Sequence, residues 1–179
     1  GDVAFSQLQY NKAIEQYSSL ADKSPGVLLK IGLSQLLEGD LKNAESTFAN
    51  ETIAGSTYAL EASFYLFCTR LSRSLDSDSY MFIDQNQIDY VDNTLNELFS
   101  ATNTPTAALQ IAVNQLVQFH KDSETVASEN ARAPISVLLS NVISKLPAVE
   151  PSDHARNAAI RMKYYHGENK YDQFFMEAK

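Results

Sequence analysis

The stretch Leu28–Phe48, LLKIGLSQLLEGDLKNAESTF, decides the fold that the sequence predicts. Its apolar residues recur three and four positions apart on both sides of Gly39-Asp40, which is the spacing of helices rather than strands. Two helices joined by a two-residue turn pack antiparallel. The stretch therefore predicts a helical hairpin in which Gly39 adopts a positive φ at the end of the first helix.

The same order of residue types occurs earlier in the chain. A large apolar residue is followed by alanine three positions later and by an aromatic residue four positions after that. The two sets are Tyr10, Ala13 and Tyr17, and Leu41, Ala44 and Phe48. They lie 31 positions apart, and an internal period of roughly 20–50 residues indicates a repeat array. Small residues such as Gly32 would let helix backbones approach, while the rings fill the space between helix pairs.

These motifs resemble the tetratricopeptide repeat (TPR) family, whose unit is an antiparallel helix pair. The resemblance is carried in the second unit by Gly32, Gly39-Asp40, Leu41, Ala44 and Phe48, and in the first by Gly1, Tyr10, Ala13, Tyr17, Leu20 and Pro25. Leu8 occupies the turn position where the family usually has glycine. Residues 158–178 look like a degenerate unit, with Tyr171 after the turn and Phe174 in place of the small alanine.

The repeat register also concerns the start of the chain. It places Gly1 halfway along a first helix, so we expect the chain to begin inside a longer protein, whose upstream part has room for a targeting, lipid-anchor or membrane segment. The compartment therefore stays open: cytoplasmic without such an anchor, periplasmic or membrane-anchored with one. No apolar run of about 18 residues occurs, so we expect no membrane span within residues 1–179.

Helical periodicity continues after residue 55, although the repeat motif decays. Helices are expected at 57–74 and 87–100, and others are expected to start after the cap Thr104-Pro105, at Pro134, after the cap Ser152 and at Tyr171. The chain is therefore predicted to be all-α, with about eight or nine helices in a TPR-like α-α superhelix, or solenoid, of antiparallel helix pairs. We expect one domain over residues 1–179, with clear repeats at 1–50 and divergent helical pairs at 56–179.

The composition argues against several classes of function. The formal net charge is −8 and the 14 basic residues are scattered, so we expect no nucleic-acid binding. The hydrophobic fraction of 44% is enough for a packed core. Cys68 is the single cysteine and lies in the apolar run FYLFC, which predicts a buried, unreactive thiol.

Residues capable of catalysis or metal binding form no recognisable motif. The three histidines, His120, His154 and His166, lack the spacing of a metal pair, and His120 is expected at a helix end in a surface or capping role. Asp76–Ser79 resembles the start of a calcium loop, but unsuitable residues occupy the later ligand positions. No phosphate loop or nucleophile motif occurs. We therefore expect no metal, no cofactor and no enzymatic activity.

The first helix of the second unit carries the candidate partner site. In the TPR family, ligands lie along the wall formed by the first helix of each pair, and here this wall would present Leu29, Leu33, Leu36 and Leu37. Leucines stand where the family's carboxylate clamp has lysine and asparagine, so we do not expect that clamp. An apolar wall suits an amphipathic helix or an extended apolar peptide. The alternative is that other parts of the chain cover these leucines.

Two functions are consistent with these observations. The first is a non-catalytic protein–protein interaction scaffold that binds a protein or peptide through a TPR-like concave surface. The alternative is a self-associating structural segment, a homo-oligomer, within a larger membrane- or envelope-tethered protein. The repeat pair and the apolar wall favour the first, and the truncated first helix favours the second.

Overall fold

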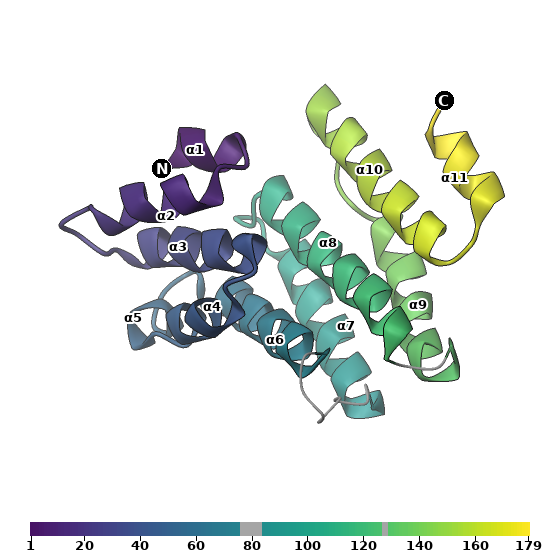
Figure 1. Ribbon diagram of the computed structural model, residues 1–179, viewed down its shortest axis with the longest axis horizontal. Helices are drawn as coiled ribbons and strands as arrows, with labels where there is room; N and C mark the ends of the chain where they lie inside the picture. The colour runs from purple at the N-terminus through teal and green to yellow at the C-terminus, as the bar shows by residue number, and fades with distance from the viewer. Residues whose placement is uncertain (76–83, 127–128) are drawn as a thin grey trace. The chain divides into compact units, whose positions relative to one another are not determined.

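The computed structural model describes residues 1–75, 84–126 and 129–179, and every regular element in these ranges is a helix (Figure 1). The described residues form 11 α-helices and the short 3-10 helix Ser123–Thr125, which confirms the all-α class. The sequence-based number of eight or nine left aside the truncated first helix, which is α1 (Asp2–Ser6), and it missed the short helix α5 (Glu51–Ala54). The segment Asp76–Ser79, which resembles a calcium loop, lies outside the described residues.

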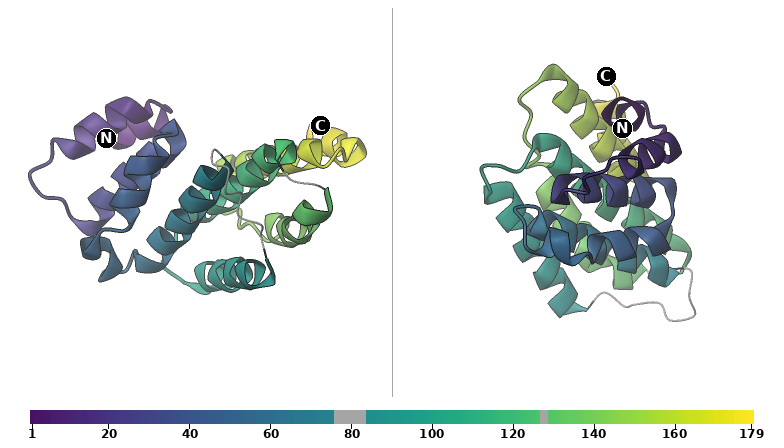
Figure 2. Two further views of the ribbon diagram at one scale, coloured as in Figure 1. Left: turned by 60° about the horizontal axis from the view of Figure 1, so that its bottom comes forward. Right: turned by 90° about the vertical axis from the view of Figure 1, so that its left-hand side faces the viewer.

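The chain divides into two compact units, residues 1–77 and 78–179, and each is described by itself. The first contains α1, α2 (Tyr10–Ser18), α3 (Pro25–Glu38), α4 (Leu41–Phe48), α5 and α6 (Ala59–Leu75). The second contains α7 (Gln85–Ser100), α8 (Thr106–Asp122), α9 (Glu129–Ile143), α10 (Pro151–Gly167) and α11 (Tyr171–Glu177). In the first unit, α3 lies between α2 and α4 (Figures 1 and 2). The single domain over residues 1–179 stays a prediction.

Three helix hairpins share one turn conformation. The pairs α1–α2, α3–α4 and α10–α11 are joined through residues with a positive φ, namely Leu8 (59°), Gly39 (90°) and Asn169 (56°). In each turn the next residue donates its backbone N–H to the carbonyl five positions earlier, with N···O distances of 2.9, 2.9 and 2.8 Å. The left-handed residue donates to the carbonyl three positions before it. Each turn therefore satisfies two carbonyls at the end of its first helix.

The shared turn supports the internal repeat that the sequence predicts. Leu8 and Gly39 lie 31 positions apart, as do the residue sets that follow them. Gly39 has the positive φ expected of it, whereas Leu8 adopts the same conformation at a steric cost that glycine avoids. Asn169 makes the corresponding turn inside the segment 158–178. The TPR-like superhelix itself stays a prediction, because hairpins alone do not establish how helix pairs stack.

Glycine allows the paired helices of the first unit to cross closely. A Cβ atom at Gly32 on α3 would lie 2.6 Å from the ring of Phe48 on α4. A Cβ atom at Gly1, 31 positions earlier, would lie 2.1 Å from the ring of Tyr17 on α2. Both rings are buried, and that of Phe48 also lies 5.6 Å from the Tyr65 ring on α6. As predicted, the aromatic side chain fills the space between one helix pair and the next helix.

The structure corrects two predicted helix starts, those at Pro134 and Ser152. The helix α8 begins at Thr106, directly after Thr104-Pro105, as predicted. The helix α10 begins at Pro151. There the Asp153 carboxylate accepts hydrogen bonds from the backbone N–H groups of Val149 and Glu150, at 3.1 and 3.0 Å. The N-cap residue of α10 is therefore Glu150, whose backbone N–H is held by the Asp153 carboxylate, while Ser152 lies inside the first turn and does not cap it.

Pro134 lies inside α9, which begins at Glu129. A proline in a helix interior removes one backbone hydrogen bond, which is why the residue pattern predicts a helix start there. The guanidinium of Arg132, on the N-terminal side of the proline, donates two hydrogen bonds to the His120 carbonyl on α8, at 3.2 and 3.0 Å. This contact between helices holds the first turn of α9 in place and offsets the loss at Pro134.

We predict that Gly32→Ala destabilises the protein by about 1–3 kcal/mol, because the added Cβ displaces the buried Phe48 ring. Gly55→Ala is the matched control, since its Cβ would meet no atom closer than the Glu51 carbonyl at 4.0 Å. We expect that control to change stability by no more than about 0.5 kcal/mol. Urea unfolding of both variants measures the difference, and equal effects would show that the α3–α4 crossing tolerates a side chain.

We predict that Leu8→Gly stabilises the protein by about 0.5–1 kcal/mol, because it relieves the positive φ of a leucine whose side chain is largely exposed. Gly39→Ala changes the equivalent turn in the opposite sense and is expected to destabilise by about 1 kcal/mol. Thermal unfolding of the two variants tests whether the turns are equivalent. A loss of stability in Leu8→Gly would mean that contacts of the leucine side chain outweigh its backbone strain.

Candidate functional site

Three of the four leucines predicted to form a partner-binding wall are buried. Leu29, Leu33 and Leu36 have 5%, 6% and 5% of their surface exposed, and Leu37 is half-buried. A partner can reach the three buried side chains only if their present neighbours move, so their role in binding stays a prediction. The exposed side chain in the middle of α3 is that of Lys30.

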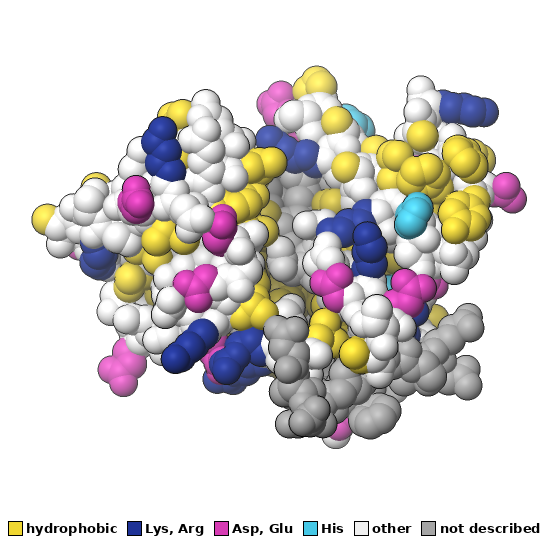
Figure 3. Space-filling view, viewed as in Figure 1, with side chains coloured by type: hydrophobic (Ala, Val, Ile, Leu, Met, Phe, Trp, Pro, Cys, Tyr) yellow, Lys and Arg dark blue, Asp and Glu magenta, His cyan; other side chains and the backbone are white. Residues whose placement is uncertain are grey.

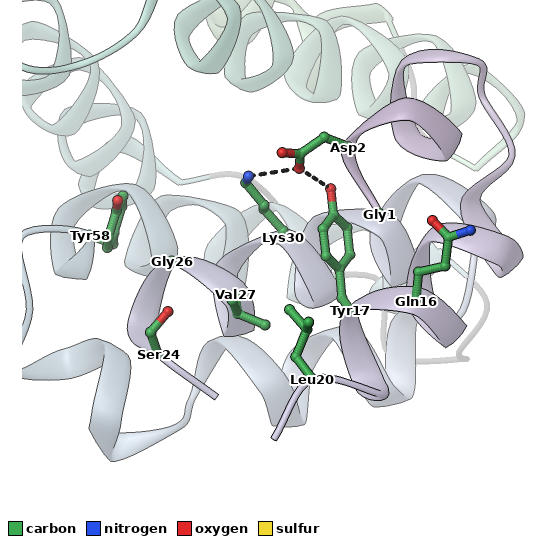
Figure 4. Close-up of a pocket in the computed structure, with 10 residues that line it drawn as sticks. All are labelled: Gly1, Asp2, Gln16, Tyr17, Leu20, Ser24, Gly26, Val27, Lys30 and Tyr58. Atoms are coloured by element: carbon green, nitrogen blue, oxygen red, sulfur yellow. Dashed lines mark hydrogen bonds and ion pairs between the residues drawn. The ribbon is translucent and has the colours of Figure 1, made fainter. Parts of the chain in front are cut away.

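A pocket of about 370 Å³, called the Lys30 pocket below, lies beside this lysine in the first unit (Figure 4). Its residues come from the start of α1, the end of α2, the first half of α3 and the segment before α6. On its polar side, the Asp2 carboxylate accepts hydrogen bonds from Lys30 Nζ at 2.7 Å and from the Tyr17 hydroxyl at 2.6 Å. On its apolar side, Leu20 and Val27 lie next to each other (Figure 4).

On the polar side of the Lys30 pocket, Asp2 and Tyr17 each have one protonation state near neutral pH. Hydrogen bonds from Lys30 and Tyr17 hold the pKa of Asp2 below its usual value. Burial, together with the hydrogen bond to Asp2, raises the pKa of the Tyr17 hydroxyl. The carboxylate is therefore charged and the phenol neutral, and neither of the two exchanges a proton near neutral pH. They suit binding through hydrogen bonds rather than general acid–base catalysis.

A second polar cluster joins three helices of the second unit. Glu168, which follows α10, places Oε1 2.5 Å from His120 Nε2 on α8, and its Oε2 accepts a hydrogen bond from the Ser136 hydroxyl on α9 at 2.5 Å. The Tyr164 hydroxyl donates to the Ser136 carbonyl at 2.9 Å and accepts from Lys170 at 3.2 Å. A pocket of about 420 Å³ lies against His120, Ser136 and Glu168.

His120 is buried in the last turn of α8, which corrects the predicted surface or capping role. Its side chain is 3% exposed, and burial lowers the pKa of the imidazole although Glu168 opposes the shift. An ionised carboxylate only accepts, so the neutral imidazole donates from Nε2 to Glu168. Its Nδ1 is then an acceptor with no hydrogen-bond partner among the described residues. The capping role at the end of α8 belongs to Arg132.

The cluster is arranged as a cross-link between helices. Burial by itself would raise the pKa of Glu168, but hydrogen bonds from Ser136 and His120 outweigh it and hold the pKa below its usual value. The Ser136 hydroxyl is bonded to this carboxylate, so Glu168 joins α9 to α8 through its two oxygens. Sequence reasoning missed the cluster because His120 and Ser136 lie 48 and 32 positions from Glu168.

Among the residues that the structure describes, no three histidine, cysteine, aspartate or glutamate side chains lie close enough together to hold a metal ion. In the same ranges, no helix has both the length and the apolar character that crossing a membrane requires.

Cys68 on α6 is buried, as predicted, and burial raises the pKa of its thiol. The thiol is therefore protonated at neutral pH and poorly nucleophilic.

Comparison of the chain with protein-family models, curated proteins and solved structures gives no match. The resemblance to the TPR family therefore stays a prediction from the residues that carry it. The structural feature that supports the internal repeat is the turn shared by α1–α2, α3–α4 and α10–α11.

We predict that the free energy of unfolding falls as the pH is lowered from about 7 to about 5, because His120 has a lower pKa in the fold than the value of about 6.5 expected when unfolded. The contribution of the neutral His120 imidazole to stability is complete above the pKa that it has in the unfolded chain. This contribution is lost as the pH falls through the pKa that it has in the fold. The charged groups that act on the imidazole are Arg132, Glu124 and Glu168, and of these Arg132 assists the lowering.

His120→Gln should flatten this pH dependence, because the amide can donate to Glu168 but does not titrate. His154→Gln is the matched control, since His154 is exposed on α10. Urea unfolding at a series of pH values compares the three proteins. If His120→Gln keeps the slope of the unmodified chain, the buried imidazole does not couple protonation to folding.

Proposed function

We propose that the chain is a non-catalytic interaction module that binds a protein or peptide partner in the Lys30 pocket. The observation that supports this most directly is that one side of the pocket is apolar and the other is polar. On the polar side, Asp2 is ionised and Tyr17 is neutral at neutral pH. Ligand sites in proteins are typically apolar concavities with a few well-placed polar groups. The pocket also lies along α1 and α3, the first helices of two hairpins, where the resemblance to the TPR family implies a ligand surface.

The chemistry of the pocket suits an extended peptide. Lys30 retains N–H donors besides the one bonded to Asp2, and these can reach a backbone carbonyl or a carboxylate of the partner. Leu20 and Val27 offer contacts for one apolar side chain. The hydroxyl of Tyr58 lies over Gly26, where a Cβ atom would be only 3.2 Å from it. The absence of a side chain at Gly26 therefore keeps this part of the pocket open.

We predict that peptides selected from a random library on the intact chain lose at least about tenfold in affinity when Lys30 is changed to Glu. The change removes the ammonium donors and places a second carboxylate beside Asp2. Lys12→Glu is the matched control, because it makes the same change of charge at an exposed position on α2. Fluorescence anisotropy with labelled peptides measures the dissociation constants.

Loss of peptide binding in Lys30→Glu can be distinguished from loss of the fold. The Asp2–Lys30 pair is exposed, so its loss should change stability by no more than about 1 kcal/mol and leave the fold intact, as circular dichroism can verify. Failure to select any peptide would count against the proposal. So would selected peptides that bind Lys30→Glu as tightly as the unmodified chain, since they would occupy another surface.

Self-association is the second candidate function, and one observation favours it. Val3 on α1 and Leu8 in the following turn are large apolar residues that are mostly exposed. Contact between copies would remove this apolar surface from water. Sedimentation velocity over a range of concentrations distinguishes the two candidates, because a peptide-binding module can remain monomeric, whereas self-association requires a concentration-dependent rise in mass.

A further inference from the structure

The pocket of about 420 Å³ in the second unit is larger than the cross-link between helices requires, and it is called the His120 pocket below. Its wall is formed by the end of α8 and the short helix after it, by α9, and by the turn between α10 and α11. One water molecule takes up about 30 Å³, whereas small-molecule sites begin at about 300 Å³. The volume therefore suits a small ligand rather than a single water.

The imidazole of His120 brings an unused hydrogen-bond acceptor to this pocket. Its side chain is 3% exposed, and its Nε2 is occupied by the bond to Glu168. Nδ1 is therefore the one ring nitrogen left for contact with a molecule in the pocket, and it has no hydrogen-bond partner in the described chain. Buried polar atoms in native proteins are nearly always hydrogen-bonded. A ligand that donates an N–H or O–H to Nδ1 would satisfy this acceptor.

The ionisable groups on the wall of the His120 pocket favour a cation. Glu124 and Glu168 are negative at neutral pH and Arg132 is positive, so their charges sum to −1. The guanidinium of Arg132 already donates from Nε and Nη2 to the His120 carbonyl. The Glu124 carboxylate is exposed, and none of the ion pairs in the described chain involves it. Its charge acts on the imidazole, which places the carboxylate near that ring.

A protonated primary amine matches both the acceptor and the charge. Its N–H groups can donate to Nδ1, and its charge is opposite to that of the two carboxylates. An alcohol can donate to Nδ1 but gains no ionic attraction from Glu124. A carboxylate ligand could approach Arg132, but at neutral pH it has no proton to donate, so Nδ1 would stay without a partner. Of these classes of ligand, the amine alone satisfies both groups.

We propose that the His120 pocket binds a small molecule with a protonated primary amine, which donates a hydrogen bond to His120 Nδ1 and lies beside the Glu124 carboxylate. The bond between Nε2 and Glu168 fixes the tautomer of the ring, so Nδ1 is held as the acceptor. The cross-link between α8 and the α10–α11 turn thus prepares the site before the ligand arrives. The site belongs to the second unit and does not depend on the function proposed for the Lys30 pocket.

The probe is n-butylamine, titrated into the intact ¹⁵N-labelled chain and followed by NMR. Acidic and basic side chains are intermixed on the face in Figure 3, but the net charge of −8 attracts any cation, so about 0.15 M salt is used to screen it. We expect a dissociation constant of about 1 mM. Butyltrimethylammonium lacks the N–H, n-butanol lacks the charge and butyrate reverses it, so each should bind at least about fivefold more weakly.

Two variants test the two groups separately. His120→Gln keeps a donor to Glu168 but has no acceptor in the place of Nδ1, so it should weaken butylamine binding at least about fivefold. Glu124→Gln removes one exposed charge and should weaken it about threefold. Glu97→Gln, an exposed residue on α7 outside the pocket wall, makes the same change of charge and should leave binding unaltered. Circular dichroism verifies that each variant keeps its fold.

The Nδ1 resonance of His120 should shift as butylamine binds, because the nitrogen gains a donor. An unchanged resonance would mean that water alone satisfies Nδ1, and it would overturn the proposal. So would equal affinity for butyltrimethylammonium or butyrate, or binding that does not saturate by about 10 mM butylamine. Binding of Nα-acetyl-lysine amide at least about tenfold more tightly than butylamine would assign the pocket to a lysine of a protein partner instead. Loss of peptide binding in Lys30→Glu would leave this proposal untouched.

Discussion

The close crossing of α3 and α4 at Gly32 is the constraint on which the first unit depends. The bare backbone there accepts the ring of Phe48, and the same ring contacts Tyr65 on α6. One missing side chain thus positions two helices at once, because a ring pushed away from Gly32 would also lose its place against Tyr65. The left-handed turn at Gly39 directs α4 back along α3, so the turn and the crossing act on the same pair of helices. The packing leaves Lys30 as the exposed group in the middle of α3.

Features that depend on neighbours a few positions away could be predicted from the sequence. The hairpin Leu28–Phe48, the positive φ at Gly39 and the burial of Cys68 all follow from local spacing and composition. The left-handed conformation of Leu8 could not be predicted in this way. The repeat register identified its position, but a leucine gives no sign of a left-handed conformation. Only the hydrogen bonds of the turn, which match those at Gly39, account for the strain that it carries.

Features that depend on distant residues could not be predicted. His120 makes its hydrogen bond with Glu168, 48 positions away, and the part of α9 that precedes Pro134 is aided by a contact of Arg132 with α8. The leucine wall shows a different limit. A binding groove and a core have the same apolar spacing, so periodicity alone does not tell whether Leu33 is covered. The polar side of the Lys30 pocket could not be predicted either, because it depends on the bond between Lys30 and Asp2, which lies 28 positions earlier in the chain.

The two units hold equivalent hairpins by different contacts. In α3–α4 the second helix contributes a buried ring, so its apolar face is committed to the core. In α10–α11 the turn is held by the carboxylate of Glu168, which bonds to both α8 and α9, and the end of α11 is held by the Arg161–Glu177 fork. Polar contacts therefore position α11 without burying any of its side chains. The hairpin turn alone therefore does not decide whether the second helix joins a core, because Phe48 on α4 is buried while Phe174 on α11 stays half-buried with its ring against His166 on α10.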